Sequence, residues 1–295
     1  MRGSFFYYTD MRVAIQGIGG CNHHIAAIDF FGENKIENVD CETFGELASK
    51  VVENPEILGI MAIENTIAGS LLQNYRIIRE TGLVIVGEYK LRIKHSLLAL
   101  PGVGLDEIKE VNSHPMALMQ CADYLERLQG VKLVEKDDTA GSAKWIKEQN
   151  LRDHAAIAPA GAAALYGMDI LADGIETNKR NFTRFLILAN PTVAPQVLEQ
   201  LSQGQRINKS AMVFTLPHTS GSLSKILAIL SFYDMNLTMI QSLPIVGKEW
   251  EYQFYINLLF DDYMRYRQAV EAIRPLTGEF QIMGEYVDGR QSVND

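Results

Sequence analysis

The stretch Asn181-Phe182-Thr183-Arg184-Phe185-Leu186-Ile187-Leu188 is the most informative part of this chain. It has the composition of a buried strand, yet it carries a hydroxyl and a guanidinium side by side, and both are costly to bury without partners. Alternation along a strand sends Thr183 and Phe185 to one face and Arg184 to the other. At least one polar group should therefore meet a ligand, water or another residue. The alternative is an ordinary strand entrance, with Thr183 bonded to the backbone and Arg184 in solvent.

Length and composition describe a globular protein of moderate size. With 295 residues, the chain should hold about two domains at roughly 100–200 residues each. It is 47% hydrophobic and 21% charged, which is ordinary for a folded protein. The net charge of −9 argues against a nucleic-acid partner, because phosphate contacts need clustered Lys and Arg. A small molecule or another subunit is the expected partner.

The cysteines and the N-terminal segment indicate a cytoplasmic protein. Cys21, Cys41 and Cys121 form no closely spaced pair and are odd in number, so we expect buried, reduced thiols. Residues 1–10 are too short for the apolar region of a signal peptide, and we interpret them as an extension, with Met11 as an alternative start. No apolar run of about 18 residues occurs, so no membrane partner is expected.

Two patterns of elements follow one another along the chain. Residues 11–190 alternate short apolar runs with helical stretches, which predicts an α/β domain. A polar segment at 191–206 predicts a linker. Residues 207–288 predict a ferredoxin-like βαββαβ unit, and 289–295 a C-terminal tail. The expected elements of this unit are strands at 211–216, 237–246, 251–260 and 280–287 and helices at 222–233 and 263–273.

Two motifs near the N-terminus suggest cofactor or metal sites, and both are disfavoured. The glycine-rich turn at 17–20 follows a strand, and Asp40 lies near the spacing of a ribose-binding acid. The third glycine of a dinucleotide fingerprint is replaced by Asn22, which disfavours a nicotinamide cofactor and leaves an anion-holding turn as an open interpretation. His23 and His24 point about 100° apart on a helix, and too few other ligands follow them for a metal site.

Polar turns follow several apolar strands of the first domain. Glu64-Asn65-Thr66 leads into Gly69-Ser70, Ser113-His114-Pro115 precedes a helical stretch at 116–128, and Asp137-Asp138-Thr139 precedes another at 140–149. Simple helix caps would explain each turn alone. In open α/β sheets, however, ligands bind at the carboxyl ends of strands, and several such turns together indicate one site.

Taken together, these motifs resemble those of the prephenate dehydratases that carry a C-terminal ACT regulatory domain. The elements occur in the family's order, and the resemblance spans about 11–288. The matching pieces are Glu64-Asn65-Thr66 with Gly69-Ser70, Ser113-His114-Pro115 with Gln120, Asp138-Thr139, and Asn181 to Phe185.

The resemblance implies a fold, a reaction and partners. The catalytic domain would have two α/β lobes, similar to a type II periplasmic binding protein, with the substrate between them. The reaction would convert prephenate to phenylpyruvate, water and carbon dioxide in phenylalanine biosynthesis, with no cofactor and no metal. The chain would form a homodimer or homotetramer through its ACT domains, with L-phenylalanine as the expected effector.

The resemblance also assigns residues to roles. Thr183 would donate a hydrogen bond or a proton to the leaving hydroxyl, with Asn65, Ser113 and Gln120 orienting the substrate and Glu64 completing the catalytic set. Arg184 would face either a substrate carboxylate or a structural acid. The substrate-binding residues would be Thr66, Gly69, Ser70, His114, Asp138, Thr139, Arg184 and Phe185. The effector-binding residues would be Gly221, Ser222, Leu223, Gln241 and Ser242.

Some positions depart from the family pattern and keep rival functions open. Gly20-Cys21-Asn22-His23 replaces the usual first loop, and Met116 stands where glutamine is usual. Gln241-Ser242-Leu243-Pro244 lacks the acid and the arginine of the effector element, which weakens the expectation of feedback. A non-catalytic sensor of amino acids or keto acids is one rival. Arogenate or chorismate as the substrate is another.

Overall fold

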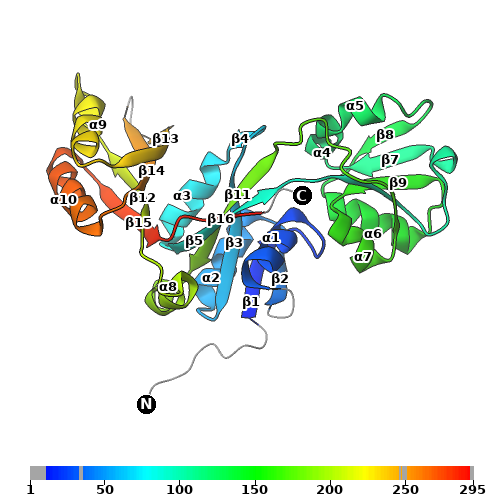
Figure 1. The fold of residues 1–295 in the computed structure, drawn as a ribbon, viewed down its shortest axis with the longest axis horizontal. Coiled ribbons are helices and arrows are strands. Elements are labelled where there is room, and N and C mark those ends of the chain that lie inside the picture. Colours follow the sequence, from blue (N-terminus) through cyan, green and yellow to red (C-terminus); the bar gives the residue numbers. More distant parts are fainter. Residues whose placement is uncertain (1–10, 33–35, 246, 248–250, 293–295) are drawn as a thin grey trace, which may run out of the picture.

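The fold comprises three layered units in a row, with the first lobe in the middle (Figure 1). The computed structural model describes residues 11–32, 36–245, 247 and 251–292, so the predicted extension at 1–10 lies outside the described residues. Each unit is built on its own sheet. None of the helices in the described segments is long and apolar enough to cross a membrane.

The first lobe is a mixed sheet whose strand order is β16-β5-β11-β3-β1-β2, with β4 paired to β3. Strand β3 is almost entirely buried because helices cover both of its faces and β1 and β11 flank it. The strands are β1 (Met11–Gln16), β2 (Ile36–Cys41), β3 (Ile57–Asn65), β4 (Gly69–Ser70), β5 (Val84–Arg92), β11 (Phe182–Ala189) and β16 (Arg290–Gln291). The helices are α1 (Asn22–Phe31), α2 (Phe44–Glu53), α3 (Leu72–Thr81) and α8 (Ala194–Ser202).

The second lobe is inserted into the first, between β5 and β11. Its sheet has the order β10-β6-β9-β7-β8. The chain therefore crosses between the lobes twice, at 93–95 and 173–181, and the two crossings are hydrogen-bonded to each other. The elements are β6 (Ser96–Ala99), η2 (Leu105–Glu107), β7 (Glu110–Ser113), α4 (Pro115–Gln120), α5 (Ala122–Leu125), β8 (Lys132–Glu135), α6 (Thr139–Gln149), β9 (His154–Ala158), α7 (Ala160–Tyr166) and β10 (Asp169–Ala172).

The third unit confirms the predicted βαββαβ pattern. Its antiparallel sheet has the order β13-β14-β12-β15, as expected for a ferredoxin-like unit, and its helices lie on one side. The predicted boundaries agree with the structure to within about two residues, because strand and helix periods alternate cleanly here. The elements are β12 (Lys209–Thr215), α9 (Ser222–Phe232), β13 (Asn236–Pro244), β14 (Tyr252–Leu259), α10 (Tyr263–Ile273), η3 (Arg274–Leu276) and β15 (Phe280–Tyr286).

Two segments differ from the sequence expectation. The segment predicted as a linker, 191–206, contains α8, whose Val197 and Leu198 pack on the core of the first lobe. The segment predicted as a tail, 289–295, contributes β16, which pairs in parallel with β5. Both are short and largely polar, and their structure depends on long-range contacts that local patterns do not show.

The third unit and the first lobe share one hydrophobic core. Met61 and Ile85 from the first lobe cluster with Val213, Tyr255 and Met283 from the third unit. The contact is closest at Gly284 in β15, where a Cβ atom would overlap the carbonyl oxygen of Ile85 in β5. A glycine is required here because two backbones meet without space for a side chain.

Replacing Gly284 with alanine should separate these two backbones. We expect Gly284→Ala to lower the free energy of unfolding by about 1–3 kcal/mol, the usual cost of overpacking, measured by urea denaturation. Gly45→Ala is the matched control, since a Cβ there meets nothing closer than 3.8 Å. Equal stability of the two variants would contradict the close approach inferred for β15 and β5.

Candidate active site

A cleft of about 280 Å³ lies between the two lobes and collects many of the predicted site residues. The first lobe contributes the ends of β1 and β3 and the starts of β11 and α1, and the second contributes α4 and the start of α6. The crossing at 93–95 contributes Ile93 and His95. The predicted residues that line this cleft are Asn65, His114, Gln120, Asp138, Thr139, Thr183 and Phe185.

Asn65 and Thr183 form the best-defined polar pair of the cleft. The Nδ2 group of Asn65 donates to Thr183 Oγ1 at 2.9 Å and to Asn181 Oδ1 at 2.7 Å. Its Oδ1 accepts the backbone N–H groups of Ile67 and Ala68 at 3.0 and 2.9 Å, which fixes the orientation of the amide. Because the Thr183 hydroxyl accepts from Asn65, its own hydrogen is available for a group in the cleft.

The electrostatics of the cleft depend on N–H and O–H donors rather than on cations. Among the described lining residues there is no lysine or arginine. Helix α1 begins here at Asn22, and no side chain caps its N-terminus. Unpaired N–H groups and the helix dipole at such a terminus favour an anion. The start of α6 also lies here, with Asp138 accepting the N–H of Gly141.

Three side chains in the cleft are neutral because they are buried. Burial lowers the pKa of His23 to about 3 and also lowers the pKa of His95. The pKa of the Cys21 thiol is raised to about 12, mainly by burial. His23 accepts the N–H of Ala62 at 3.3 Å, and its ring packs edge-on against Phe185. The unusual first loop therefore forms a packed wall of the cleft, and Cys21 stays a thiol rather than a nucleophilic thiolate.

Besides Arg184, five predicted residues lie outside the set that lines the cleft, for identifiable reasons. Glu64 precedes Asn65 in β3, so alternation turns it to the opposite face. Ser113 is fully buried and donates to the carbonyl of Ile157 at 2.6 Å, joining β7 to β9. Thr66 bonds the backbone near the second crossing, and Gly69 and Ser70 form β4. These residues were expected to contact the substrate. In the structure they instead support the strands and turns around Asn65 and Thr183.

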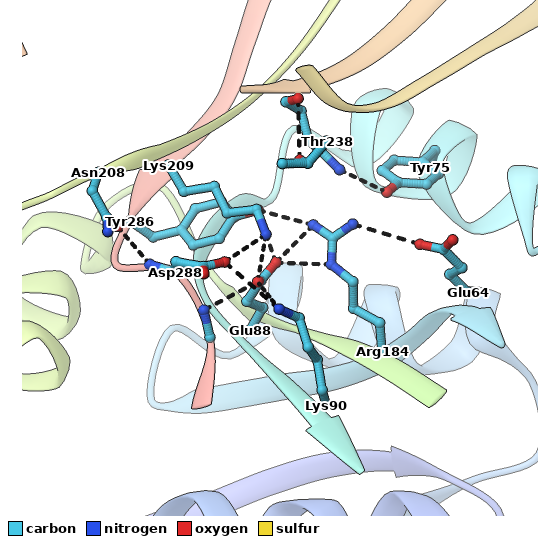
Figure 2. Close-up of polar contacts among 12 residues, drawn as sticks. Glu64, Tyr75, Glu88, Lys90, Arg184, Asn208, Lys209, Thr238, Tyr286 and Asp288 are labelled. Atoms are coloured by element: carbon cyan, nitrogen blue, oxygen red, sulfur yellow. Dashed lines mark hydrogen bonds and ion pairs between the residues drawn. The ribbon is translucent and has the colours of Figure 1, made fainter. Parts of the chain in front are cut away.

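Arg184 also lies away from the cleft, because it follows Thr183 in β11 and points to the opposite face. Figure 2 shows its guanidinium directed at Glu88. Its guanidinium contacts Glu88 of β5 at 2.7 and 2.8 Å. The predicted alternation is therefore confirmed, and the substrate-binding assignment of Arg184 is wrong: its partner is a structural acid. The residue faces the third unit because β11 alternates and β5 offers a buried carboxylate on that face.

Glu88 is the centre of a buried charge network between the first lobe and the third unit (Figure 2). Lys209 at the start of β12 contacts Glu88 at 2.6 Å and Asp288 at 2.8 Å. Tyr286 accepts from Arg184 at 3.3 Å, and the N–H of Gly289 donates to Glu88. Burial alone raises the pKa of Glu88, but Arg184 and Lys209 outweigh it and lower the pKa to about 2.

Several cleft residues were not assigned from the sequence. Of these, His95 could have been noticed in the sequence, because it lies just before the apolar run at 97–100. The first loop and Met116 had been recognised only as departures from the family pattern. The other lining residues without an assigned role are far apart in the sequence and come together only in the folded protein. The lining residues without an assigned role include Gln16, Cys21, Asn22, His23, Phe44, His95, Met116 and Asp137.

The predicted effector residues divide between two places. Gly221, with a φ of +81°, precedes α9, and Ser222 and Leu223 begin that helix. Gln241 and Ser242 lie on β13, which pairs only with β14 in the described sheet. The Gln241 amide donates to Ser70 Oγ at 3.3 Å, so it contacts the β3–β4 hairpin that carries Asn65.

A two-lobed α/β chain with a polar interlobe cleft belongs to the class of proteins that bind small molecules between two lobes. The sequence model for prephenate dehydratase matches residues 13–193. The chain belongs to the prephenate dehydratase family, whose members are enzymes that dehydrate prephenate.

Similar known proteins cover nearly the whole chain. An arogenate dehydratase/prephenate dehydratase from Arabidopsis thaliana is 37% identical, over 94% of this chain and 72% of that protein. The structure of a prephenate dehydratase from Arthrobacter aurescens in complex with L-Phe has a TM-score of 0.81 at 24% identity, covering 94% and 89% of the two chains. A structure described as a novel type of quorum quenching acylase has a TM-score of 0.81 at 26% identity, covering 94% and 98%.

The low pKa of Glu88 predicts an acid-sensitive fold. The carboxylate contributes stability above its unfolded pKa of about 4.5, and this contribution is lost as the pH falls towards 2. The loss should reach about 3 kcal/mol, measured as the free energy of unfolding against pH. Glu88→Gln should flatten this part of the curve, whereas Glu80→Gln, at an exposed surface pair, should not. Equal slopes for wild type and Glu88→Gln would exclude the network as the cause.

Proposed function

We propose that the chain converts prephenate to phenylpyruvate, water and carbon dioxide, with Thr183 acting on the leaving hydroxyl. The observation that carries this proposal is the hydrogen bond from Asn65 to Thr183 at 2.9 Å in the interlobe cleft. Asn65 orients the threonine oxygen and leaves its hydrogen directed at a ligand. This is the arrangement that a positioned donor requires.

The reaction requires the protein chiefly to position the substrate and one hydrogen-bond donor. Loss of the ring carboxylate and the hydroxyl makes the product aromatic, so the electrons of the breaking carbon–carbon bond move into the ring as the hydroxyl leaves. The protein must hold the substrate and hydrogen-bond or protonate the departing oxygen. A threonine hydroxyl is a weak acid, so its contribution is chiefly a hydrogen bond to the developing charge.

Binding of the substrate carboxylates is assigned to N–H groups. The uncapped start of α1 offers backbone donors at Asn22, and Gln120 offers a carboxamide. His114 and Thr139 begin the neighbouring helices of the second lobe. Neutral donors hold the carboxylates without forming a tight ion pair, which leaves the departing carboxylate free to become carbon dioxide.

Removing the Thr183 hydroxyl should remove most turnover. We expect Thr183→Ala to lower kcat by about 100-fold or more, as for loss of one preorganised donor, and Thr183→Ser to restore most of it. Phenylpyruvate production from prephenate, followed by absorbance in alkali, is the assay. Thr81→Ala is the matched control, since that hydroxyl bonds only the backbone of α3. Near-normal turnover of Thr183→Ala would remove Thr183 from the mechanism.

Arogenate is the second candidate substrate, because the named plant relatives include arogenate dehydratases. Arogenate carries an ammonium where prephenate carries a ketone, and Asp137 and Asp138 lie in the cleft as candidate partners. Parallel assays with both substrates decide between them. If neither is converted but prephenate or phenylalanine binds, the chain is instead a sensor on this scaffold.

We also propose the domain boundaries, the oligomeric state and the cellular location of the protein. Residues 11–190 form the proposed catalytic domain and 207–288 the proposed ACT domain, with L-phenylalanine as its effector. The edge of β13 that pairs with no described strand, and the ferredoxin-like sheet, support a homodimer or homotetramer paired through this domain. A small-molecule biosynthetic reaction and three free, buried cysteines support a cytoplasmic setting.

Phenylalanine should bind this chain weakly. Leu243 stands where the family's arginine would make a charge-assisted contact, and such a bond is worth about 1.5–3 kcal/mol, or about 10- to 100-fold in affinity. Calorimetry should therefore show weak binding, and Gln241→Glu, which restores the acid of the motif, should tighten it. Tight binding by the unaltered chain would show that the altered motif does not disable the effector site.

A further inference from the structure

We propose that His95 is a positioning residue of the dehydratase, which holds the Gln120 carboxamide so that its N–H groups face the substrate. The inference rests on the proposed function and extends it to a residue outside the matched family motifs. Three observations carry it: the place of His95 on the crossing between the lobes, its contact with Gln120, and the hydrogen bonding of its ring.

His95 is fixed where the two crossings meet. It lies between β5 and β6 and is only 2% exposed. Its backbone N–H donates to Glu176 Oε2 at 3.0 Å, and its carbonyl accepts the N–H of Ile175 at 2.9 Å. Both partners belong to the second crossing, 173–181. Because both the N–H and the carbonyl of His95 are hydrogen-bonded to the second crossing, the position of its imidazole is restricted.

The same crossings hold Gln120 from two directions. His95 Nε2 lies 2.9 Å from Gln120 Oε1, and the Gln120 carbonyl accepts the N–H of Thr177 at 2.8 Å. Gln120 is the last residue of α4, yet its main chain and its side chain are both bonded to the crossings. Its position should therefore stay fixed relative to the crossings if the lobes close on a substrate.

The ring of His95 determines which end of the Gln120 amide faces the cleft. Burial lowers the pKa of His95, although Gln120 and Glu176 oppose the effect, so the imidazole is neutral. One ring nitrogen then donates and the other accepts. Nδ1 is buried and has no hydrogen-bond partner among the described residues. A buried donor without an acceptor is rarer and costlier than an unused acceptor, so the proton belongs on Nε2, facing Gln120 Oε1.

This tautomer has a consequence for the substrate. With Oε1 engaged by His95, the amide nitrogen of Gln120 is the end left to face the cleft. The described cleft lining has no lysine or arginine, so each aimed N–H group matters more to an anion there. Without the histidine the carboxamide could rotate and present its oxygen to a carboxylate, which would repel it.

The test compares two amides at position 95. The side-chain nitrogen of glutamine lies as many bonds from Cα as histidine Nε2, and that of asparagine as many as Nδ1. His95→Gln should therefore keep kcat/KM for prephenate within about threefold, whereas His95→Asn should lower it by about tenfold or more, a part of the effect of losing a donor outright. Both variants should melt within a few degrees of each other.

A double substitution separates positioning from general structural support. If His95 acts through Gln120, His95→Asn should have little further effect on kcat/KM in a Gln120→Ala background. Additive losses, equal activity of the two position-95 variants, or wild-type activity of His95→Asn would each overturn the proposal. Absence of dehydratase activity in the wild type would instead reject the proposed function, so the two failures are distinguishable.

Discussion

The buried carboxylate of Glu88 is the constraint on which the arrangement of the three units depends. An ion taken out of water needs nearby countercharges and hydrogen bonds, and leaving one unpaired costs about 3–5 kcal/mol. Arg184 from the first lobe and Lys209 from the third unit supply the two nearest cations, and Lys90 lies 3.9 Å away. Gly289 adds a backbone N–H from the segment that leads into β16. The sheet of the first lobe therefore keeps this carboxylate fully paired only with the third unit in place.

Strand β11 joins this network to the cleft. Consecutive residues point to opposite faces, so Arg184 enters the charge network while Thr183 faces the cleft and accepts from Asn65. A shift of β11 by one residue would exchange the two faces and disrupt both at once. The buried ion pair thus fixes the register that presents the threonine, although the two side chains never touch.

The sequence predicted the periodic parts of this protein well and its long-range contacts poorly. Alternation in β11 and the βαββαβ unit followed from local patterns and are confirmed. The sequence left open whether Arg184 meets the substrate or a structural acid, because its partner, Glu88, lies on a neighbouring strand and no local pattern marks that pairing. Ser113 was placed in the cleft by its motif, whereas the fold turns it into the second lobe. His95 has a role only once two distant crossings meet.

The return of the chain to its first sheet limits how this protein can change in evolution. The third unit lies between β11 and β16, both of which belong to the first lobe. Recombination at a single point after β11 would bring in a foreign edge strand together with the foreign unit. That strand would have to fit β5, where Arg290 pairs with Tyr89. Exchange of the third unit between relatives therefore needs two matched junctions, which favours inheritance of the whole chain as one block.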